Sequence, residues 1–424
     1  MNPLYLAAIL VISLLYVWTL YNVPIFVAGV RRLRRTKSRK QELSVCSRAE
    51  LPSVSVIVPV KDEENVVGRL LNALLKSDYP EEKRDIIVVE DGSVDKTAEI
   101  CRGFEREYPG QVKVVCRGVS DGKPSALMEA LKHVKGEIVG VFDADNVPES
   151  DALLRAANHF NDSSVVAVQG RVCAINAEEN MLTQLVAQEE TVRYEGFMGG
   201  KEALGLFVPL NGSCYFVRRD VLEDVGGWDT TVLSEDMELA ARLIHNGYKI
   251  KYASDVRSWQ EYPSSLVGFF KQRARWFRGT MEVGFKYGKL LKNMNMISLD
   301  AEVTMAGSFV FISCLVGYFI ALLSLVVPLK PDFVSLFVAN VTSVFTVVLL
   351  GLAGVAMVYT TKPRRLRNLL WVPFIYLYWI VQNFIASYAL MQILLRRPKR
   401  WLRTEKYGVI ANSTFVSETE QVYA

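Results

Sequence analysis

Long apolar segments bordered by basic clusters constrain the fold of this chain more than any other feature. The first, Leu4–Val30, exceeds the roughly 20 residues that a helix needs to cross a bilayer. Met305–Val327 and Phe333–Tyr359 follow much later, separated only by Pro328–Asp332 as in a helical hairpin, and Leu369–Leu394 is a fourth. We therefore predict an integral membrane protein.

A cleaved signal peptide is the alternative for the first segment. No basic residue precedes this segment, it is longer than the apolar part of a typical signal peptide, and no small-residue cleavage site stands out. A membrane anchor is the better prediction.

The basic clusters Arg31–Lys40, Lys362–Arg367 and Arg396–Arg403 all border apolar segments. Because basic loops favour the cytosolic side, the first cluster predicts a cytosolic domain after the anchor and an N-terminus outside. A hairpin would return the chain to the cytosol at the second cluster, so a fourth full span would put the third cluster outside, against the same rule. Two interpretations of Leu369–Leu394 stay open: a partly re-entrant or interfacial segment, or a span that breaks the rule.

The rest of the composition excludes several classes of protein. A net charge of +4 over 424 residues is too small to indicate binding to nucleic acid. The six cysteines contain no CxxC pair and the three histidines have no ligand-like spacing. We therefore expect reduced thiols rather than a disulfide framework or a zinc site.

From Pro52 onward, short β-branched runs alternate with helical stretches. This alternation predicts an α/β domain with a parallel or mostly parallel sheet covered by helices. The expected strands are Val54–Val58, Asp85–Val89, Val112–Val115 and Glu137–Phe142, and the expected helices are Asn65–Lys76, Thr97–Tyr108 and Ser125–His133.

Three acidic clusters follow expected strands, at Lys61–Glu64, Glu90–Ser93 and Asp143-Ala-Asp145. In open α/β sheets, ligands bind outside the carboxyl ends of the strands. A loop cap explains any one cluster equally well, but three clusters on the same edge favour a binding site.

Asp143 and Asp145 directly follow the apolar run Ile138–Phe142, and their extended spacing sends both carboxylates to one side. Such a pair suits a hard divalent ion that is also bound by phosphate oxygens. Lys123 is placed to reach the same phosphates, although a solvated surface lysine explains this residue equally well.

Together these residues resemble the family-2 glycosyltransferases, which include cellulose, chitin and hyaluronan synthases and ceramide glucosyltransferases. The resemblance covers about residues 54–279. It rests on five motifs in order: Val54-Ser-Val-Ile-Val-Pro59 with Glu63, Val88-Val-Glu-Asp-Gly-Ser93, Asp143-Ala-Asp145, Ser234-Glu-Asp236 and Gln272-Arg-Ala-Arg-Trp276.

The sequence departs from the family pattern at several places. Lys61-Asp62 replaces an aromatic residue and Asn, Glu90 replaces the first Asp of the second motif, Ser234 replaces Thr, and Asn211-Gly-Ser213 lacks the Cys of cellulose synthases. None of these changes removes a residue expected to do chemistry. They do weaken an assignment to the cellulose, chitin or hyaluronan branch in particular.

The resemblance implies a GT-A fold, that is, a Rossmann-like nucleotide-sugar-binding domain, and it assigns the site residues. Asp143 and Asp145 would hold the metal, Mg²⁺ or Mn²⁺, and Asp236 would be the catalytic base. Residues implied to bind the nucleotide sugar are Pro59, Glu63, Asp91, Lys123, Asp143, Gln272 and Arg275, and those implied to bind the acceptor are Trp276, Glu235, Asn211 and Gly212.

The Ser-Glu-Asp motif also has a plainer explanation. Ser234 looks like the N-cap of a helix over Glu235–Asn246, whose first-turn acids would complement the helix dipole. If Asp236 is the base, desolvation has to offset the lowering of its pKa by the helix N-terminus.

Gln272, Arg275 and Trp276 share one face of an amphipathic helix that we expect to begin near Ser264. The basic and aromatic residues around them are also typical of a helix lying on a membrane surface. A helix on a membrane surface does not require Gln, Arg and Trp side chains on one and the same helix face. An indole stacks on a sugar ring, whereas Gln and Arg side chains bond pyrophosphate or acceptor oxygens.

We therefore expect an inverting, metal-dependent transferase of the plasma membrane, with its catalytic domain in the cytosol. It would add sugar from a UDP-linked donor to a growing β-linked cell-surface polysaccharide. Single transfer onto a membrane lipid, such as ceramide or a polyprenyl phosphate, is the alternative. A non-catalytic scaffold or transporter subunit is a third interpretation, which the intact acidic set opposes.

The expected partners are the nucleotide sugar, the acceptor and membrane lipids, and no nucleic acid. So few spans make a self-sufficient export pore doubtful, unless a second copy of the chain or an export partner contributes. The predicted units are an anchor (1–30), a basic cytosolic linker (31–51), the GT-A domain (52–262), interfacial helices (263–300), a membrane region (301–395) and a basic cytosolic-type tail (396–424).

Overall fold

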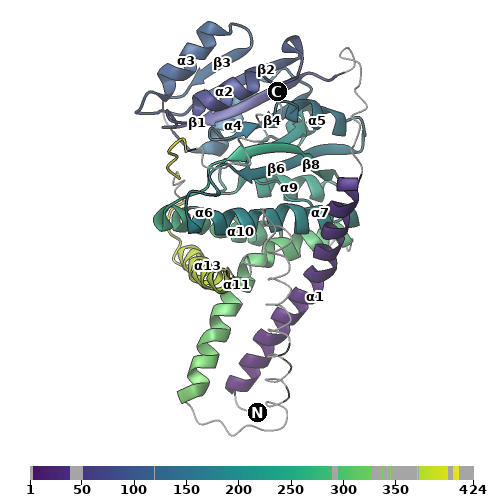
Figure 1. Cartoon of the computed structure of the whole chain (residues 1–424), viewed down its shortest axis with the longest axis vertical. Coiled ribbons are helices and arrows are strands. Elements are labelled where there is room, and N and C mark those ends of the chain that lie inside the picture. Colours follow the sequence, from purple (N-terminus) through teal and green to yellow (C-terminus); the bar gives the residue numbers. More distant parts are fainter. Residues whose placement is uncertain are drawn as a thin grey trace.

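The computed structural model of the chain describes residues 3–38, 51–118, 120–288, 295–326, 337, 341, 344, 370, 372–399 and 404–409. Nearly all of the predicted segment Phe333–Tyr359 and the whole basic cluster Lys362–Arg367 lie outside the described residues, so the hairpin stays a prediction. Figure 1 shows an α/β domain at one end of the molecule, long apolar helices at the other, and a layer of helices between them.

The first half of the α/β domain is a parallel sheet with helical connections. Its elements are β1 (Val54–Val60), α2 (Val67–Leu75), β2 (Arg84–Glu90), α3 (Thr97–Glu107), β3 (Val112–Cys116), α4 (Lys123–Leu131) and β4 (Ile138–Val141). The strands run parallel in the order β3-β2-β1-β4. The predicted alternation is confirmed, with element ends shifted by a residue or two. The Val/Ile run of β1 is almost wholly buried, as expected for a central parallel strand.

The second half of the domain departs from the expected parallel arrangement. It adds β5 (Val147–Pro148), α5 (Ala152–His159), β6 (Val165–Ala174), β7 (Tyr215–Arg218) and β8 (Lys249–Gln260). Strands β6 and β8 are parallel, but β7 runs antiparallel between β4 and β6, and β5 runs antiparallel to β8. The chain reaches β7 only after passing through the interfacial layer, so no crossover helix fixes a parallel direction for this strand. Six of the eight strands of the described sheet nevertheless run in one direction, so the predicted mostly parallel sheet is confirmed, with β5 and β7 as its antiparallel strands.

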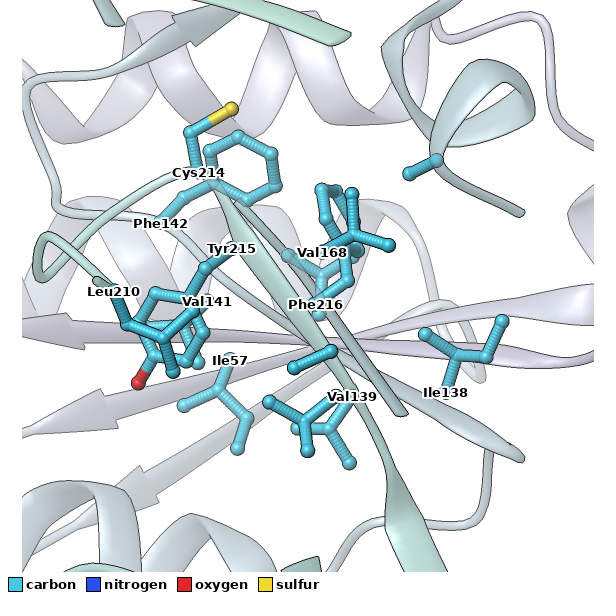
Figure 2. Packing of buried hydrophobic residues seen from close by; sticks show 14 of the residues in the cluster. Ile57, Ile138, Val139, Val141, Phe142, Val168, Leu210, Cys214, Tyr215 and Phe216 are labelled. Atoms are coloured by element: carbon cyan, nitrogen blue, oxygen red, sulfur yellow. The ribbon is translucent and has the colours of Figure 1, made fainter. Parts of the chain in front are cut away.

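The hydrophobic core is densely packed where β4 and β7 meet. Phe142 and Phe216 contact each other edge to face, with ring centroids 5.7 Å apart, and Ile57 and Val141 lie close by (Figure 2). Gly140 lies against Phe216 so closely that a Cβ atom would be 2.8 Å from the ring. This packing holds the end of β4 in place, and with it the start of the acidic pair that follows.

A layer of helices separates the sheet from the long apolar helices (Figure 1). It contains α6 (Met181–Thr191), the π-helix η3 (Val192–Met198), α7 (Gly199–Leu204) and α10 (Leu266–Tyr287). Asn180 caps α6 in a capping box with Thr183, and its amide nitrogen also donates to the Ser264 carbonyl just before α10, at 3.0 Å. The two long helices of the layer are thus joined at their N-terminal ends.

Three helices among the described residues are long and apolar enough to cross a membrane, over residues 6–35, 296–324 and 373–394. They belong to α1 (Pro3–Ser38), α11 (Met296–Val326) and α13 (Val372–Leu394). A buried cluster ties two of them to the interfacial layer. The Asp300 carboxylate of α11 accepts hydrogen bonds from Tyr21 of α1 at 2.5 Å and from Lys201 of α7 at 2.8 Å. Helices α1 and α11 are therefore anchored directly to the layer that carries part of the site.

Helix α13 follows the interfacial layer along much of its length. Tyr378 near its start and Tyr388 near its end contact the aromatic rings of Phe269 and Phe270 in α10, with centroids 5.2 and 5.3 Å apart. Directly after the helix, Arg278 of α10 donates to the carbonyl of Arg397 at 2.6 Å. In Figure 1, α13 runs across the direction of α1 and α11. This placement favours the interfacial interpretation of the fourth apolar segment, and it leaves the following tail on the side of the α/β domain.

Candidate active site

A cavity of about 600 Å³ lies between the carboxyl edge of the sheet and the interfacial layer. Every site residue that the sequence predicted lines this cavity. These residues are Pro59, Glu63, Asp91, Lys123, Asp143, Asp145, Asn211, Gly212, Glu235, Asp236, Gln272, Arg275 and Trp276. The fold therefore brings together segments from β1 to α10 that are far apart in the sequence.

The ends of β1 and β2 form one wall of the cavity. Both carboxylate oxygens of Asp91 are engaged, one by Arg117 at 2.7 Å and the other by Ser120 at 2.6 Å. The backbone N–H of Glu63 donates to the Thr97 hydroxyl at 2.7 Å, which fixes the turn after β1 against the start of α3. Strand ends and short loops thus hold this wall by hydrogen bonds to neighbouring turns.

The acidic pair after β4 is held from both sides. The backbone N–H of Asp143 donates to the Ser213 hydroxyl at 2.9 Å, and the Asp143 carboxylate accepts from Lys123 at 2.6 Å. Asp145 is buried, and its carboxylate pairs with the Lys406 ammonium at 2.5 Å. Within the described residues, no group of three or more His, Cys, Asp and Glu side chains is placed to hold a metal ion.

Lys123 lies inside the protein, so the alternative of a solvated surface lysine is wrong. Its ammonium donates to the Gly212 carbonyl at 2.6 Å and lies 3.4 Å from the Glu235 carboxylate, besides its contact with Asp143. Burial alone would lower the pKa of Lys123, but the charges of Asp143, Glu235 and Asp236 outweigh it and raise this pKa. Lys123 is therefore a permanent positive charge in the cavity.

The Ser-Glu-Asp motif begins α9 (Glu235–His245), with Ser234 at the N-cap position as predicted. The Ser234 side chain makes no capping hydrogen bond. It packs instead against Gly279 of α10, where a Cβ atom would be 2.1 Å from the Ser234 hydroxyl. This close contact positions the start of α9 against the interfacial layer.

Asp236 is partly exposed to the cavity, although it lies deep inside the molecule. One of its carboxylate oxygens accepts a hydrogen bond from the backbone of Met237 at 2.8 Å. Burial, followed by the charge of Glu235, raises the pKa of Asp236 to about 7, against the opposing effects of Lys123 and the backbone hydrogen bonds. Desolvation thus raises the pKa of Asp236 more than the helix N-terminus lowers it. A general base at this position requires this balance.

The predicted stripe of α10 also faces the cavity, which is lined by Gln272, Arg275, Trp276 and, one turn later, Thr280. Burial is the main effect on Arg275 and lowers its pKa, partly offset by the charge of Glu235. The intervening Arg273 does not line the cavity. Helical periodicity thus correctly separated the cavity-facing residues from their neighbours.

Sequence reasoning missed two further parts of the cavity wall. One consists of Glu190, Arg193 and Tyr262, from α6, η3 and the segment after β8. Glu190 and Arg193 fall in a stretch without a recognisable motif. A helical pattern of charged residues over 181–193 was the available signal, and it does not say which face meets a ligand.

The second missed part is the C-terminal segment 404–409, predicted only as a basic tail. Lys406 reaches Asp145 and also donates to the backbone carbonyl of Glu261. The backbone N–H groups of Tyr407 and Gly408 both donate to the Glu261 carboxylate, at 2.8 and 2.9 Å. These contacts hold the tail across the cavity. No local pattern pairs residue 406 with residue 145, so this contact is visible only in the tertiary structure.

Comparisons with known proteins agree with this architecture. A family model described as glycosyltransferase-like family 2 matches residues 52–279, which is more than half of the chain. A probable glycosyltransferase of Bacillus subtilis, YdaM, is 32% identical over 65% of this chain and 66% of its own length. A β-monoglucosyldiacylglycerol synthase of a Nostoc species is 32% identical over 63% of this chain and 57% of its own length. The match thus spans less than two thirds of either relative.

Two other proteins match more of the chain. A poly-β-1,6-N-acetyl-D-glucosamine synthase of Staphylococcus epidermidis is 25% identical over 93% of both chains. A solved mannosyltransferase of Pyrobaculum calidifontis, in complex with GDP-mannose and Mn²⁺, superimposes with a TM-score of 0.60 over 93% of this chain and all of its own. At 19% identity, that likeness establishes the fold alone.

Proposed function

The chain belongs to glycosyltransferase family 2, and from this premise we propose that it transfers a sugar from a UDP-linked donor to a growing β-linked polysaccharide. The observation that carries the proposal is the single cavity. It joins the acidic edge of the sheet, a carboxylate whose pKa is near neutrality, and helices on the membrane side. A soluble donor and a membrane-proximal acceptor would meet there.

The residues around the acidic pair fit a divalent metal, Mg²⁺ or Mn²⁺. Asp143 and Asp145 offer hard oxygen ligands, and each is already paired with a lysine ammonium, so the site accommodates positive charge. Such ions are often held by one or two carboxylates together with substrate phosphates. When bound, the ion would neutralise charge on the departing diphosphate. Lys123 would donate hydrogen bonds to the same leaving group.

Asp236 would act as the general base. The acceptor hydroxyl oxygen forms a bond to the anomeric carbon of the donor while the carbon–oxygen bond to the diphosphate breaks. The proton passes to Asp236, and the bonding electron pair leaves with the diphosphate. Attack from the face opposite the leaving group inverts the anomeric centre, which gives a β-linkage from an α-linked donor.

Two observations bear on the acceptor. The staphylococcal polysaccharide synthase matches 93% of the chain, which is more than the α/β domain alone, and this supports a polysaccharide product. The glucolipid synthase is more similar over its shorter match, at 32% identity, and this favours single transfer to a membrane lipid as the second candidate. The proposal also places the chain in the plasma membrane, with the α/β domain in the cytosol. It further includes a second copy of the chain or an export partner.

A donor and product assay tests the proposed function. The purified full chain in lipid nanodiscs would be incubated with Mn²⁺ and, in turn, radiolabelled UDP-glucose, UDP-N-acetylglucosamine and GDP-mannose. We expect one UDP-sugar to yield labelled, high-mass polymer. Label in the solvent-extractable lipid fraction would favour the second candidate. No transfer from any UDP-sugar, with acceptor lipids and oligosaccharides present, would contradict the proposal.

The orientation in the membrane is tested separately. In intact cells, a membrane-impermeant maleimide should fail to label a single cysteine placed at Arg35, at the end of α1. Strong labelling there would reverse the proposed topology.

A further inference from the structure

The interfacial layer contributes a polar wall to the cavity that the mechanism above does not use. Arg193 of η3 bonds the Glu190 carboxylate at 2.9 Å through Nε and the Asn211 side chain at 2.7 Å through Nη1. The Glu190 side chain is almost wholly buried, whereas 35% of the Arg193 side chain is exposed. An arginine held by a buried carboxylate thus faces the cavity in one fixed orientation.

Two further side chains that line the cavity carry polar atoms without a hydrogen-bond partner in the described part of the chain. They are the hydroxyl of Tyr262 and the amide oxygen of Gln272. Both residues line the cavity and are only 5% exposed. Burial and the charge of Glu190 raise the pKa of Tyr262, so its hydroxyl stays protonated and remains a donor. The wall therefore presents an unused donor and an unused acceptor.

We propose that Arg193, Glu190 and Tyr262, together with the Gln272 amide oxygen, form a subsite for the hydroxyl groups of a sugar ring on the acceptor. This inference rests on the proposed function and names its acceptor class, a carbohydrate or a lipid that already carries a sugar. A sugar hydroxyl both donates and accepts, so it matches fixed donors and acceptors on one wall. A plain lipid alcohol has too few hydroxyls to satisfy them.

A purely structural role explains only part of these contacts. Arg193 and Glu190 brace the loop at Asn211, and for that task their mutual bonds suffice. Bracing does not use the buried Tyr262 hydroxyl or the Gln272 amide oxygen, which belong to cavity-lining residues and whose unpaired state is unfavourable. The hydroxyl groups of a sugar in the cavity would supply partners for these groups.

Tyr262→Phe is the discriminating variant, because it removes only the hydroxyl that has no partner. Tyr252→Phe is the matched control, since the Tyr252 hydroxyl is also buried and without a partner but lies away from the cavity. Binding of cellotetraose and chitotetraose to the full chain would be measured calorimetrically with UDP and Mn²⁺ present. We expect Tyr262→Phe to weaken binding by about three- to tenfold, the usual effect of one neutral hydrogen bond, and Tyr252→Phe to leave it unchanged.

Arg193→Lys provides a second measurement, since it keeps the charge but loses the planar fork that bonds Glu190 and Asn211 at once. It should weaken oligosaccharide binding by about ten- to a hundredfold, while the affinity for UDP stays as in the wild type. Equal oligosaccharide affinities of the wild type and Tyr262→Phe would overturn the inference. A second result would also overturn the inference. It is a faster transfer by the wild type to dioleoylglycerol, which carries no sugar, than to monoglucosyldiacylglycerol or either oligosaccharide. If no acceptor at all is glycosylated but the oligosaccharide affinities differ as expected, the proposed function fails and the subsite stands.

Discussion

The two walls of the cavity are built in different ways. On the sheet side, each polar residue follows a strand or begins a helix, so a short motif carries both the residue and its position, as in Asp143-Ala-Asp145 after β4. On the membrane side, one motif, Gln272–Trp276 of α10, lines the cavity beside residues from α6, the π-helix, the segment after β8 and the C-terminal tail, and no motif joins these others. Under the proposed function, the sheet edge would carry the chemistry, and the interfacial layer and the tail would control access and recognition of the acceptor.

The largest effect is expected at the sheet edge, where the metal would be held. Asp145→Ala, or an excess of chelator, should reduce transfer by about a thousandfold or more, because charge neutralisation on the diphosphate is worth several kcal/mol. Circular dichroism and the Tm should show an intact fold. Activity of the chelated enzyme should return on adding Mn²⁺. Full transfer in excess chelator would show that this wall does not use a metal.

Asp236→Asn should lower transfer by roughly two to four orders of magnitude, the usual contribution of general acid–base catalysis. Asn keeps the size of the side chain and its bond to the Met237 backbone. The matched control is Asp220→Asn in the first turn of α8 (Arg219–Asp224), because Asp220 makes the same 2.8 Å contact to the following N–H outside the cavity. The two variants are compared by single-turnover rates at saturating donor and acceptor. Near-normal turnover by Asp236→Asn would place the base elsewhere.

The pH dependence of transfer also tests whether Asp236 is the general base, and the expected change in rate is smaller. Burial raises the pKa of Asp236 to about 7, so the carboxylate that accepts the proton is lost as the pH falls through that value. Below pH 7, kcat/KM should therefore fall about tenfold for each pH unit, and above it the rate should level off. The measurement is a kcat/KM profile with Mn²⁺ held saturating at every pH. A profile that is flat from pH 5 to 8 would disagree with a base of this pKa.

The smallest effect is expected at the tail. The Lys406 ammonium pairs with Asp145, so it opposes a second positive charge at the same carboxylate. Lys406→Gln should tighten Mn²⁺ binding by about tenfold in the absence of donor, since it removes roughly 1.4 kcal/mol of repulsion. Calorimetric titration of the full chain measures this change. Lys132→Gln is the control, because Lys132 pairs only with the neighbouring Glu129 at the surface. An unchanged or weaker Mn²⁺ affinity of Lys406→Gln would show that the tail does not compete with the metal.

Much of the chemistry of the site was predictable from local patterns. The carboxyl ends of parallel strands meet at one edge, so the turns after β1, β2 and β4 had to converge. Residues four positions apart share a helix face, so Gln272 and Trp276 had to point the same way. Family resemblance then supplied the roles, which remain predictions. The α/β class and membership of the family followed from the same local signals, and they are confirmed. Three of the four predicted apolar segments form helices long and apolar enough to cross a membrane.

The sequence by itself determined which motif residues line the cavity, because strand alternation, helical periodicity and short motifs are local properties of the chain. Tertiary structure alone decided four other features. The antiparallel β7, the burial of Lys123, the wall at Arg193 and the contact of Lys406 with Asp145 all depend on how distant segments pack. The pKa of Asp236 belongs to the same group, because desolvation is set by everything that surrounds a carboxylate and not by its neighbours in sequence.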